Sequence, residues 1–316
     1  MPTITIDGKA LEFDQGQSIL EVAHDNGLKI PHYCYHPSLS VVANCRICLA
    51  EVWAPNPRSD NKLEPMPKLL PTCQTLAGDG QVVYTSSPKA TANQKAVMEM
   101  LLNHHPIDCP TCDQAGECDL QDFAYEYGRG VRRHDAEKIT QSKKDIGDNV
   151  MLYGDRCIMC TRCVRFADEI SGTSELFIDG RGAKEYIDVF PGIGINNELS
   201  GNVIDICPVG AMLDKDFMFQ QPVWFLKTAP SIDPLTSSGD NIMIEHNNNK
   251  VYRVKPRKNL EINQYWITDE VRYGWKFVHD ESRVTEMNED AELVAAEKLQ
   301  QATKIALLVS PMLSCE

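Results

Sequence analysis

The sequence has no long apolar run and no glycine-rich nucleotide-binding motif. Among its 316 residues no stretch of 18 or more is apolar and uncharged, and no apolar segment opens the chain. Such segments mark membrane spans and cleavable signals, so neither is expected. A G-x-G-x-x-G fingerprint is also lacking, because no correctly placed third glycine follows Gly192 and Gly194, and no Walker A loop occurs.

Positive charge is scarce. The chain has 31 Lys and Arg against 45 Asp and Glu, which gives a formal net charge of −14. That balance argues against a nucleic-acid partner and against binding to anionic lipid by charge alone. The length and a hydrophobic content of 42% are enough for two or three domains with cores.

Cysteine is abundant instead. The twelve cysteines lie mostly in tight C-x-x-C groups rather than spread along the chain as cross-links would be. In a long chain without a signal, this pattern predicts a reducing compartment and metal ligation rather than disulfides.

The first ninety residues predict a small α+β unit. Residues 3–13 alternate apolar and polar side chains around Asp7-Gly8, a dipeptide typical of a type I′ hairpin turn. Ser18 and Glu21 form a capping box for a helix that Gly27 would end. With a strand at 81–84, this order resembles the β-grasp fold of plant-type ferredoxins.

Other elements are predicted with less detail. Ser87-Pro88 should begin a helix that runs to about His104. Composition predicts a surface loop at 55–71 and a connecting loop at 130–150. The remaining expected elements are a hairpin at 241–256 with an asparagine-rich turn, a helix at 289–302 and a strand at 304–309.

The first ligand set has three cysteines in one loop and a fourth further on. A β-grasp ferredoxin binds [2Fe–2S] with this arrangement, although the plant-type first gap has four residues and here it has ten. A zinc knuckle or unrelated buried cysteines are the alternatives. The set is Cys34, Cys45, Cys48 and Cys73.

The second set combines a histidine with three cysteines within fourteen residues. It could hold an iron–sulfur cluster, in which an imidazole would replace one thiolate, or tetrahedral zinc as Cys₃His. His104 is adjacent and could compete for the ligand position. The set is His105, Cys109, Cys112 and Cys118.

The third set matches the bacterial ferredoxin run, in which the Cys-Pro pair ligates the other cluster. The local Cys-Pro position holds Ala167-Asp168, and counting back from Cys207-Pro208 gives Val203, Ser200 and Asn197, which are not cysteines. The pattern is that of a two-cluster ferredoxin with one cluster erased. It predicts [4Fe–4S] on Cys157, Cys160, Cys163 and Cys207.

Together the sets use eleven cysteines and leave only Cys315. Three redox-capable sites in about 175 residues should lie close enough to pass electrons in series. The carboxylate pair Asp168-Glu169 beside the third set is interpreted as a solvated helix face. No catalytic residue is predicted, so the chain itself would carry electrons and perform no substrate chemistry.

The stretches around the second and third sets, with Leu199 to Ala211, resemble the large iron–sulfur subunit of respiratory complex I, the NADH–quinone oxidoreductases. Residues 222–280 resemble that family's next domain, which is related to molybdopterin oxidoreductases and carries a further cluster in some members. Because no cysteine lies between Cys207 and Cys315, that cluster is expected to be absent. Family members usually continue for several hundred residues, so the chain is a fragment or comes from a split or shortened gene.

The resemblance implies one [2Fe–2S] and two [4Fe–4S] clusters on the three sets. It also implies other peripheral-arm subunits as partners, notably the NADH/FMN-binding subunit, and no direct membrane insertion. The expected location is cytoplasmic, on the cytoplasmic face of the inner membrane through the complex, with electrons passing toward quinone.

The expected fold class is α+β. The predicted domains are a β-grasp domain at 1–86, a helix with the histidine-containing segment at 87–150, and a degenerate ferredoxin-like domain at 151–220. A small β-rich, molybdopterin-oxidoreductase-like domain without a cluster would follow at 221–285, and a truncated α/β domain would begin at 286–316.

Two other functions remain open. One is the iron–sulfur diaphorase subunit of an NAD-linked hydrogenase, which usually keeps the second C-x-x-C-x-x-C-x-x-x-C-P run that this chain lacks. The other is a zinc-stabilised scaffold with no redox role.

Overall fold

The computed structural model describes residues 1–135, 137–138, 140–283 and 289–306. The chain forms two compact units, Met1–Trp224 and Phe225–Glu316. All of the predicted ligands that the structure describes lie in the first unit.

A mixed sheet opens the first unit. Its order is β2-β1-β6-β3-β4, with β5 paired to β3, and only the β1–β6 pair is parallel. Apolar residues of β1 and of helix α1 (Ile19–Asp25) form the core beneath it. The strands are β1 (Thr3–Ile6), β2 (Lys9–Glu12), β3 (Leu49–Asn56), β4 (Lys62–Pro65), β5 (Leu70–Pro71) and β6 (Val82–Tyr84).

The hairpin and first helix form as predicted. Asp7 and Gly8 both have positive φ, 45° and 84°, which a type I′ turn requires. The Ser18 side chain accepts from the Glu21 backbone, and the Glu21 carboxylate accepts from the Ser18 backbone, so the capping box is complete.

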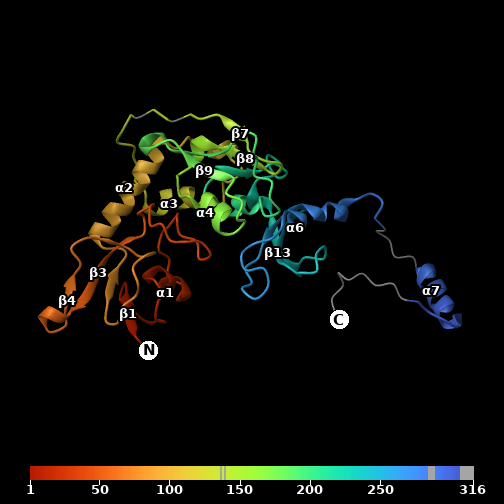
Figure 1. Cartoon of the computed structure of the whole chain (residues 1–316), viewed down its shortest axis with the longest axis horizontal. Coiled ribbons are helices and arrows are strands. Elements are labelled where there is room, and N and C mark those ends of the chain that lie inside the picture. Colours follow the sequence, from red (N-terminus) through yellow and green to blue (C-terminus); the bar gives the residue numbers. More distant parts are fainter. Residues whose placement is uncertain (136, 139, 284–288, 307–316) are drawn as a thin grey trace. The chain divides into compact units, whose positions relative to one another are not determined.

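The expectation of a surface loop at 55–71 is wrong in part. This segment continues β3, turns through a 3₁₀ helix, η1 (Pro57–Ser59), and returns as β4. Asp60 and Asn61 supply the left-handed backbone at the turn, with φ of 53° and 58°. Proline is tolerated here because β4 is an edge strand. Figure 1 shows this orange hairpin reaching away from the rest of the unit.

Helix α2 (Pro88–His104) begins at Ser87, whose side chain caps it, as predicted. It runs from the sheet to the part of the unit that holds the second and third ligand sets (Figure 1). Two short elements follow, η2 (Cys109–Thr111) and α3 (Asp119–Tyr127).

The connecting loop predicted at 130–150 contains a strand. β7 (Lys143–Asp145) pairs with β8 (Val150–Tyr153), which in turn pairs with β11 (Met212–Asp214). Pairing with β8, whose other edge is bound by the distant β11, overrides the polar composition of 143–145. The other elements are η3 (Gly154–Arg156), α4 (Arg162–Glu169), β9 (Leu176–Asp179), η4 (Gly182–Lys184), β10 (Tyr186–Val189) and α5 (Asn202–Ile206).

The second unit is a three-stranded antiparallel sheet, β12 (Lys227–Ile232), β13 (Asn241–Asn247) and β14 (Lys250–Pro256), which follows η5 (Val223–Phe225). The predicted hairpin is confirmed, since Asn248 and Asn249 take positive φ between its strands. A small core of Ile242, Val254, Ile267 and Val271 joins the sheet to α6 (Asp269–Tyr273), before η6 (Gly274–His279).

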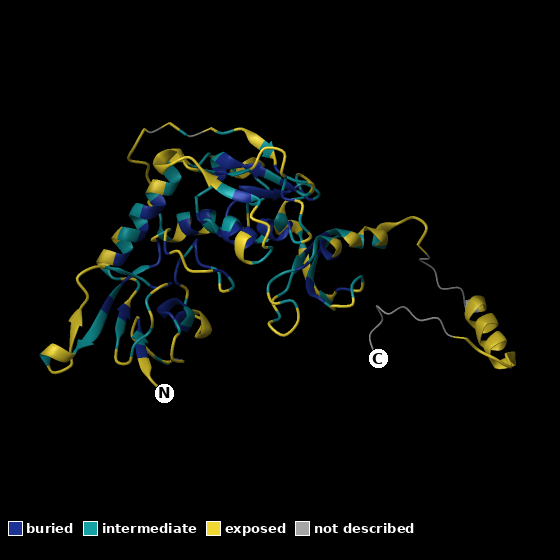
Figure 2. Cartoon of the chain, in the orientation of Figure 1, coloured by how far each residue is buried: buried dark blue, intermediate teal, exposed yellow. Residues whose placement is uncertain are grey.

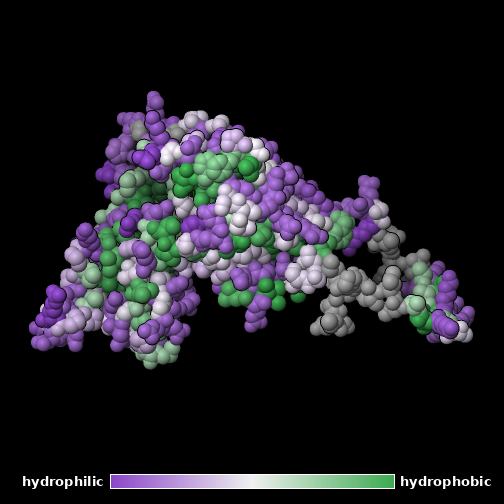
Figure 3. Space-filling view, viewed as in Figure 1, coloured by the Kyte–Doolittle hydropathy of each residue, from purple (hydrophilic) through white to green (hydrophobic). Residues whose placement is uncertain are grey.

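The helix predicted at 289–302 is present as α7 (Glu289–Gln301), largely exposed (Figure 2). The strand predicted at 304–309 is not formed at 304–306, and its other residues lie outside the described ones. None of the helices in the described ranges has both the length and the apolar character needed to cross a bilayer. On the face shown in Figure 3, hydrophobic residues are interspersed with hydrophilic ones.

Candidate iron–sulfur sites

The first set of thiols comes together between the loop before β3 and the turn after β5. Cys34 Sγ lies 3.4 Å from Cys45 Sγ, and Cys48 Sγ lies 3.7 Å from Cys73 Sγ. Hydrogen bonds from Cys34 and then Cys48 lower the pKa of Cys45, whereas those with Cys34 and Cys48 raise the pKa of Cys73. The two pairs of sulfurs are therefore neighbours, since Cys45 and Cys73 each interact with a member of the other pair.

These distances suit pairs of metal ligands. Two sulfurs bound to one tetrahedral metal, at about 2.3 Å each, lie about 3.8 Å apart. The first set thus fits two metal centres, each held by two thiols, which is the ligand arrangement of a [2Fe–2S] cluster.

The second set gathers around the end of α2. His105 is the C-cap of α2, η2 begins at Cys109, and Cys118 is the N-cap of α3. Burial, and then the Cys112 thiol among other charges, raises the pKa of Cys118 to about 12. Burial also raises the pKa of Cys112, with Cys109 adding to the shift. These three sulfurs are therefore near one another.

His105 is better placed than His104 as the fourth member. Its Nδ1 is buried without a hydrogen-bond partner, whereas His104 is exposed. Burial, and then the charges of Arg156 and Lys138, lowers the pKa of His105 to about 4. The imidazole is therefore neutral at pH 7, the form that binds metals.

A glycine opens space beside the second set. A Cβ at Gly210 would lie 2.3 Å from Cys112 Sγ, closer than atoms approach without bonding. Only a residue without a side chain allows the backbone after Cys207 to lie against this sulfur. The absence of a side chain at 210 thus preserves the position of a predicted ligand.

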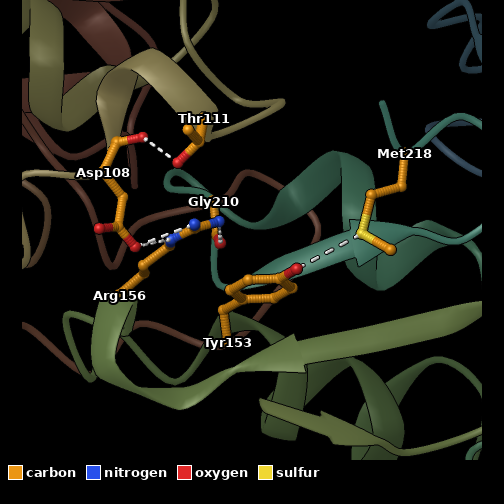
Figure 4. Close-up of polar contacts among 6 residues, drawn as sticks. All are labelled: Asp108, Thr111, Tyr153, Arg156, Gly210 and Met218. Carbon is orange, nitrogen blue, oxygen red and sulfur yellow. Dashed lines mark hydrogen bonds and ion pairs between the residues drawn. The ribbon is translucent and has the colours of Figure 1, made fainter. Parts of the chain in front are cut away.

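Arg156 joins the second set to the third (Figure 4). The Arg156 side chain is 2% exposed, donates from Nε and Nη2 to Asp108 Oδ2 at 3.1 and 3.0 Å, and donates to Gly210 O. Its guanidinium lies 4.1 Å from the centre of the Tyr153 ring. Asp108 precedes Cys109 and Arg156 precedes Cys157, so one ion pair holds the two sets in register.

The third set is brought together across forty-three intervening residues. Burial, and then the thiols of Cys160, Cys157 and Cys207, raises the pKa of Cys163. Burial raises the pKa of Cys207 while the backbone N–H groups of Val209, Met212 and Ala211 lower it. Cys207 thus lies with the other three thiols and receives hydrogen bonds of the kind that set cluster potentials.

The positions of the erased cluster are filled. Ala167, Ser200 and Val203 are completely buried, and Asn197 donates to the Glu175 carboxylate at 3.2 Å. Small and polar side chains thus occupy the region where a second ferredoxin run would have placed thiols.

The expectation for Asp168-Glu169 needs one correction. Glu169 is exposed, but it accepts hydrogen bonds from the backbone N–H and the hydroxyl of Ser40. This face of α4 therefore contacts the loop that carries the first ligand set.

The sequence reasoning missed Arg156, Gly210 and two further buried arginines, Arg162 and Arg165. All four lie inside the cysteine motifs: Arg156 and Arg162 directly precede Cys157 and Cys163, and Arg165 and Gly210 follow Cys163 and Cys207 closely. That placement is the signal that could have identified them. Cys315 lies outside the described residues.

Four family models match the chain in succession. They are a 2Fe-2S iron-sulfur cluster binding domain at 1–88 and an NADH-ubiquinone oxidoreductase-G iron-sulfur binding region at 94–133. The others are the ferredoxin-like domain of NADH-quinone oxidoreductase subunit 3 at 147–213 and the NDSU1/NuoG-like 4Fe-4S domain at 226–276. The last match contains no cysteine in this chain. With the thiol sets, these matches indicate an iron–sulfur protein that combines a 2Fe-2S domain with 4Fe-4S-type domains, one of them ferredoxin-like.

More particularly, the chain is similar to the large iron–sulfur subunit of NADH–quinone oxidoreductases. It is 39% identical over 275 residues to an NADH-quinone oxidoreductase subunit of Rickettsia bellii, covering 87% of this chain and 39% of that protein. It is 41% identical over 273 residues to the mitochondrial NADH-ubiquinone oxidoreductase 78 kDa subunit of Candida albicans, covering 86% and 36%. The chain thus spans about two fifths of the length of these relatives.

A solved structure is also similar. A chain in the crystal structure of NAD+-reducing [NiFe]-hydrogenase in the H2-reduced state matches with a TM-score of 0.61 and 29% identity. The match covers 70% of this chain and 91% of that chain.

Proposed function

We propose that the chain carries electrons through three iron–sulfur clusters as a subunit of an NADH–quinone oxidoreductase. The observation that supports this most directly is the first set, whose four thiols pair at 3.4 and 3.7 Å, beside two further sets in the same unit. Three such sites within one compact unit suit electron transfer in series rather than bond chemistry.

The proposed ligands are those of the three sets. Cys34 with Cys45, and Cys48 with Cys73, would each hold one iron of a [2Fe–2S] cluster. His105 with Cys109, Cys112 and Cys118, and Cys157 with Cys160, Cys163 and Cys207, would each hold a [4Fe–4S] cluster. When bound, such clusters supply one-electron oxidation and reduction.

The chain's own residues support that role. Backbone N–H groups directed at Cys207 and Cys118 stabilise the thiolate form that binds iron. The unpartnered Nδ1 of His105 would gain a partner on metal binding.

The relatives are named as subunits of NADH–quinone and NADH–ubiquinone oxidoreductases, so other subunits of such a complex are the proposed partners. Electrons would enter from an NADH/FMN-binding subunit and leave toward quinone within a peripheral arm on the cytoplasmic face of a membrane. We further propose that residues 221–285, where no cysteine occurs, belong to a domain that is related to molybdopterin oxidoreductases and binds no cluster.

A second candidate is an iron–sulfur subunit of an NAD-linked hydrogenase, which the matched hydrogenase structure favours. The lack of a second complete cysteine run, at Asn197, Ser200 and Val203, argues for the first candidate. Purification of the native assembly separates them, since a hydrogenase of the matched [NiFe] type would contain nickel and oxidise hydrogen, and an NADH–quinone oxidoreductase would do neither.

The test is a spectrum and a metal count on anaerobically prepared protein. Broad visible absorption that dithionite bleaches, with about ten irons and ten acid-labile sulfides per chain, is expected. A count near six irons per chain would show that one of the two proposed [4Fe–4S] sites does not hold a cluster. A colourless protein with stoichiometric zinc would overturn the proposal and support the alternative of a zinc-stabilised scaffold with no redox role.

A further inference from the structure

The loop of the first set is attached to the helix of the third. Between Cys34 and Cys45 the chain lies against α4 and the turn before it: Asn44 Nδ2 donates to Met159 O at 3.1 Å, and Ser40 N donates to Glu169 Oε2 at 2.8 Å. The ten residues between Cys34 and Cys45 therefore have a structural role. They connect the loop of the first ligand set to the helix that carries the third set.

Arg165 of α4 lies at the centre of this contact. Its Nη2 donates to Cys34 O at 2.5 Å and to Cys160 O at 3.3 Å, and its Nη1 donates to Ser40 O at 2.5 Å. Arg165 is 7% exposed. One buried guanidinium thus bonds to the backbone of a proposed ligand from each of two sets.

Arg162 repeats the arrangement one helical turn away. Its Nη2 donates to Tyr35 O at 2.7 Å and its Nη1 to Ile206 O at 3.2 Å. Tyr35 follows Cys34, and Ile206 precedes Cys207. The same two sets are therefore joined a second time, by the residue next to Cys163.

The charge of these arginines is not neutralised by direct pairing. Their hydrogen bonds go to backbone carbonyls and, from Arg165 Nε, to the Thr161 hydroxyl, and among the described residues no carboxylate forms an ion pair with either. Glu169 acts on Arg165, and Asp119 on Arg162, only through space. Burying an unpaired charge is costly, so something must offset it.

We propose that Arg165, assisted by Arg162, is a positioning residue that fixes the first and third cluster sites against each other and raises the reduction potential of both. This inference rests on the proposed function. Reduction adds negative charge to a cluster, and a fixed positive charge in a poorly solvated site stabilises that state. The clusters would in turn offset the cost of burying the guanidinium.

The test compares Arg165→Met, which removes the charge and its hydrogen bonds, with Arg165→Lys, which keeps the charge. Ser40→Ala is the matched control, because it removes the hydroxyl contact to Glu169 and leaves the backbone carbonyl that Arg165 binds. Each full-length variant would be assayed for iron content, and the midpoint potential of each cluster would be followed by EPR. Hydrogen exchange of residues 35–45 would be measured in the metal-free protein.

In Arg165→Met, the midpoint potentials of the [2Fe–2S] and the Cys157-site clusters should shift to lower values, with a smaller shift at the histidine-containing site. Exchange at 35–45 should rise. Arg165→Lys and Ser40→Ala should keep potentials near the wild type. If Arg165→Met does not assemble clusters, Arg165→Gln removes the charge while keeping an amide donor, and the same lowering is expected.

Unshifted potentials in a fully loaded Arg165→Met or Arg165→Gln protein would overturn this inference, as would an equal shift in Ser40→Ala. Both results leave the proposed function intact. A colourless wild-type protein would instead overturn the proposed function.

Discussion

Gly210 lies directly against Cys112, so closely that a single methyl group would collide with the sulfur at 2.3 Å. The contact joins the segment after Cys207, a proposed ligand of one site, to a proposed ligand of another. Because interiors are close-packed and the colliding atom is a partly buried sulfur, the chain cannot absorb the added group without moving a ligand.

Gly210→Ala should therefore damage the histidine-containing site. We expect loss of up to four irons per chain and a destabilisation of about 1–3 kcal/mol, measured by iron analysis and denaturant unfolding. Gly130→Ala is the matched control, because a Cβ there meets nothing within 4 Å. Full iron content in Gly210→Ala would contradict the prediction. It would show that the cluster does not depend on Cys112 staying in its present position.

Changing His105 tests the fourth ligand of the same site. His105→Cys should retain a four-iron cluster with an altered potential and EPR signal, because a thiolate adds negative charge to the ligand set. His104→Ala should change neither, since His104 is exposed. The opposite result would assign the ligand to His104, and iron analysis of both variants would separate ligand loss from poor assembly.

Cys207→Ala tests the long-range completion of the third set. Cys207 is buried beside Cys157, Cys160 and Cys163, so its removal should abolish or damage their cluster, seen as iron loss and a missing EPR signal. Cys315→Ala should leave every cluster signal unchanged. An intact spectrum in Cys207→Ala would place the fourth ligand elsewhere.

Asp108→Asn tests the ion pair that holds the second and third sets together. Arg156 is fully buried while Asp108 is about one third exposed (35%), so losing the carboxylate should cost about 2 kcal/mol in the free energy of unfolding. Glu126→Gln is the control, since its pair with Lys29 is exposed on both sides and should cost about 0–1 kcal/mol. Equal losses in the two variants would show that burial of Arg156 does not depend on Asp108.

The sequence alone determined the local elements and the kinds of ligand. Asp7-Gly8, the Ser18–Glu21 capping box and Ser87-Pro88 each act through neighbours within four residues, so the pattern is sufficient to predict them. The C-x-x-C groups were visible in the spacing for the same reason, whereas Cys34, Cys73 and Cys207 were assigned to their sets by the ferredoxin pattern. Whether those groups are the true ligand sets stays a prediction that iron counts on the purified protein will decide.

Tertiary structure alone decided how the sets are joined. The partners of Arg165 and Arg156 lie 131 and 48 residues away, so their place beside the cysteine motifs marks them as candidates but does not give their hydrogen-bond partners. The strand at 143–145 pairs with β8 and the hairpin at 55–71 continues β3, and both β8 and β3 are held on their other edges by strands distant in sequence, β11 and β6. Burial, packing against Gly210 and the choice of hydrogen-bond acceptor arise only when remote segments meet, because each depends on what surrounds a side chain in space rather than on its neighbours in sequence.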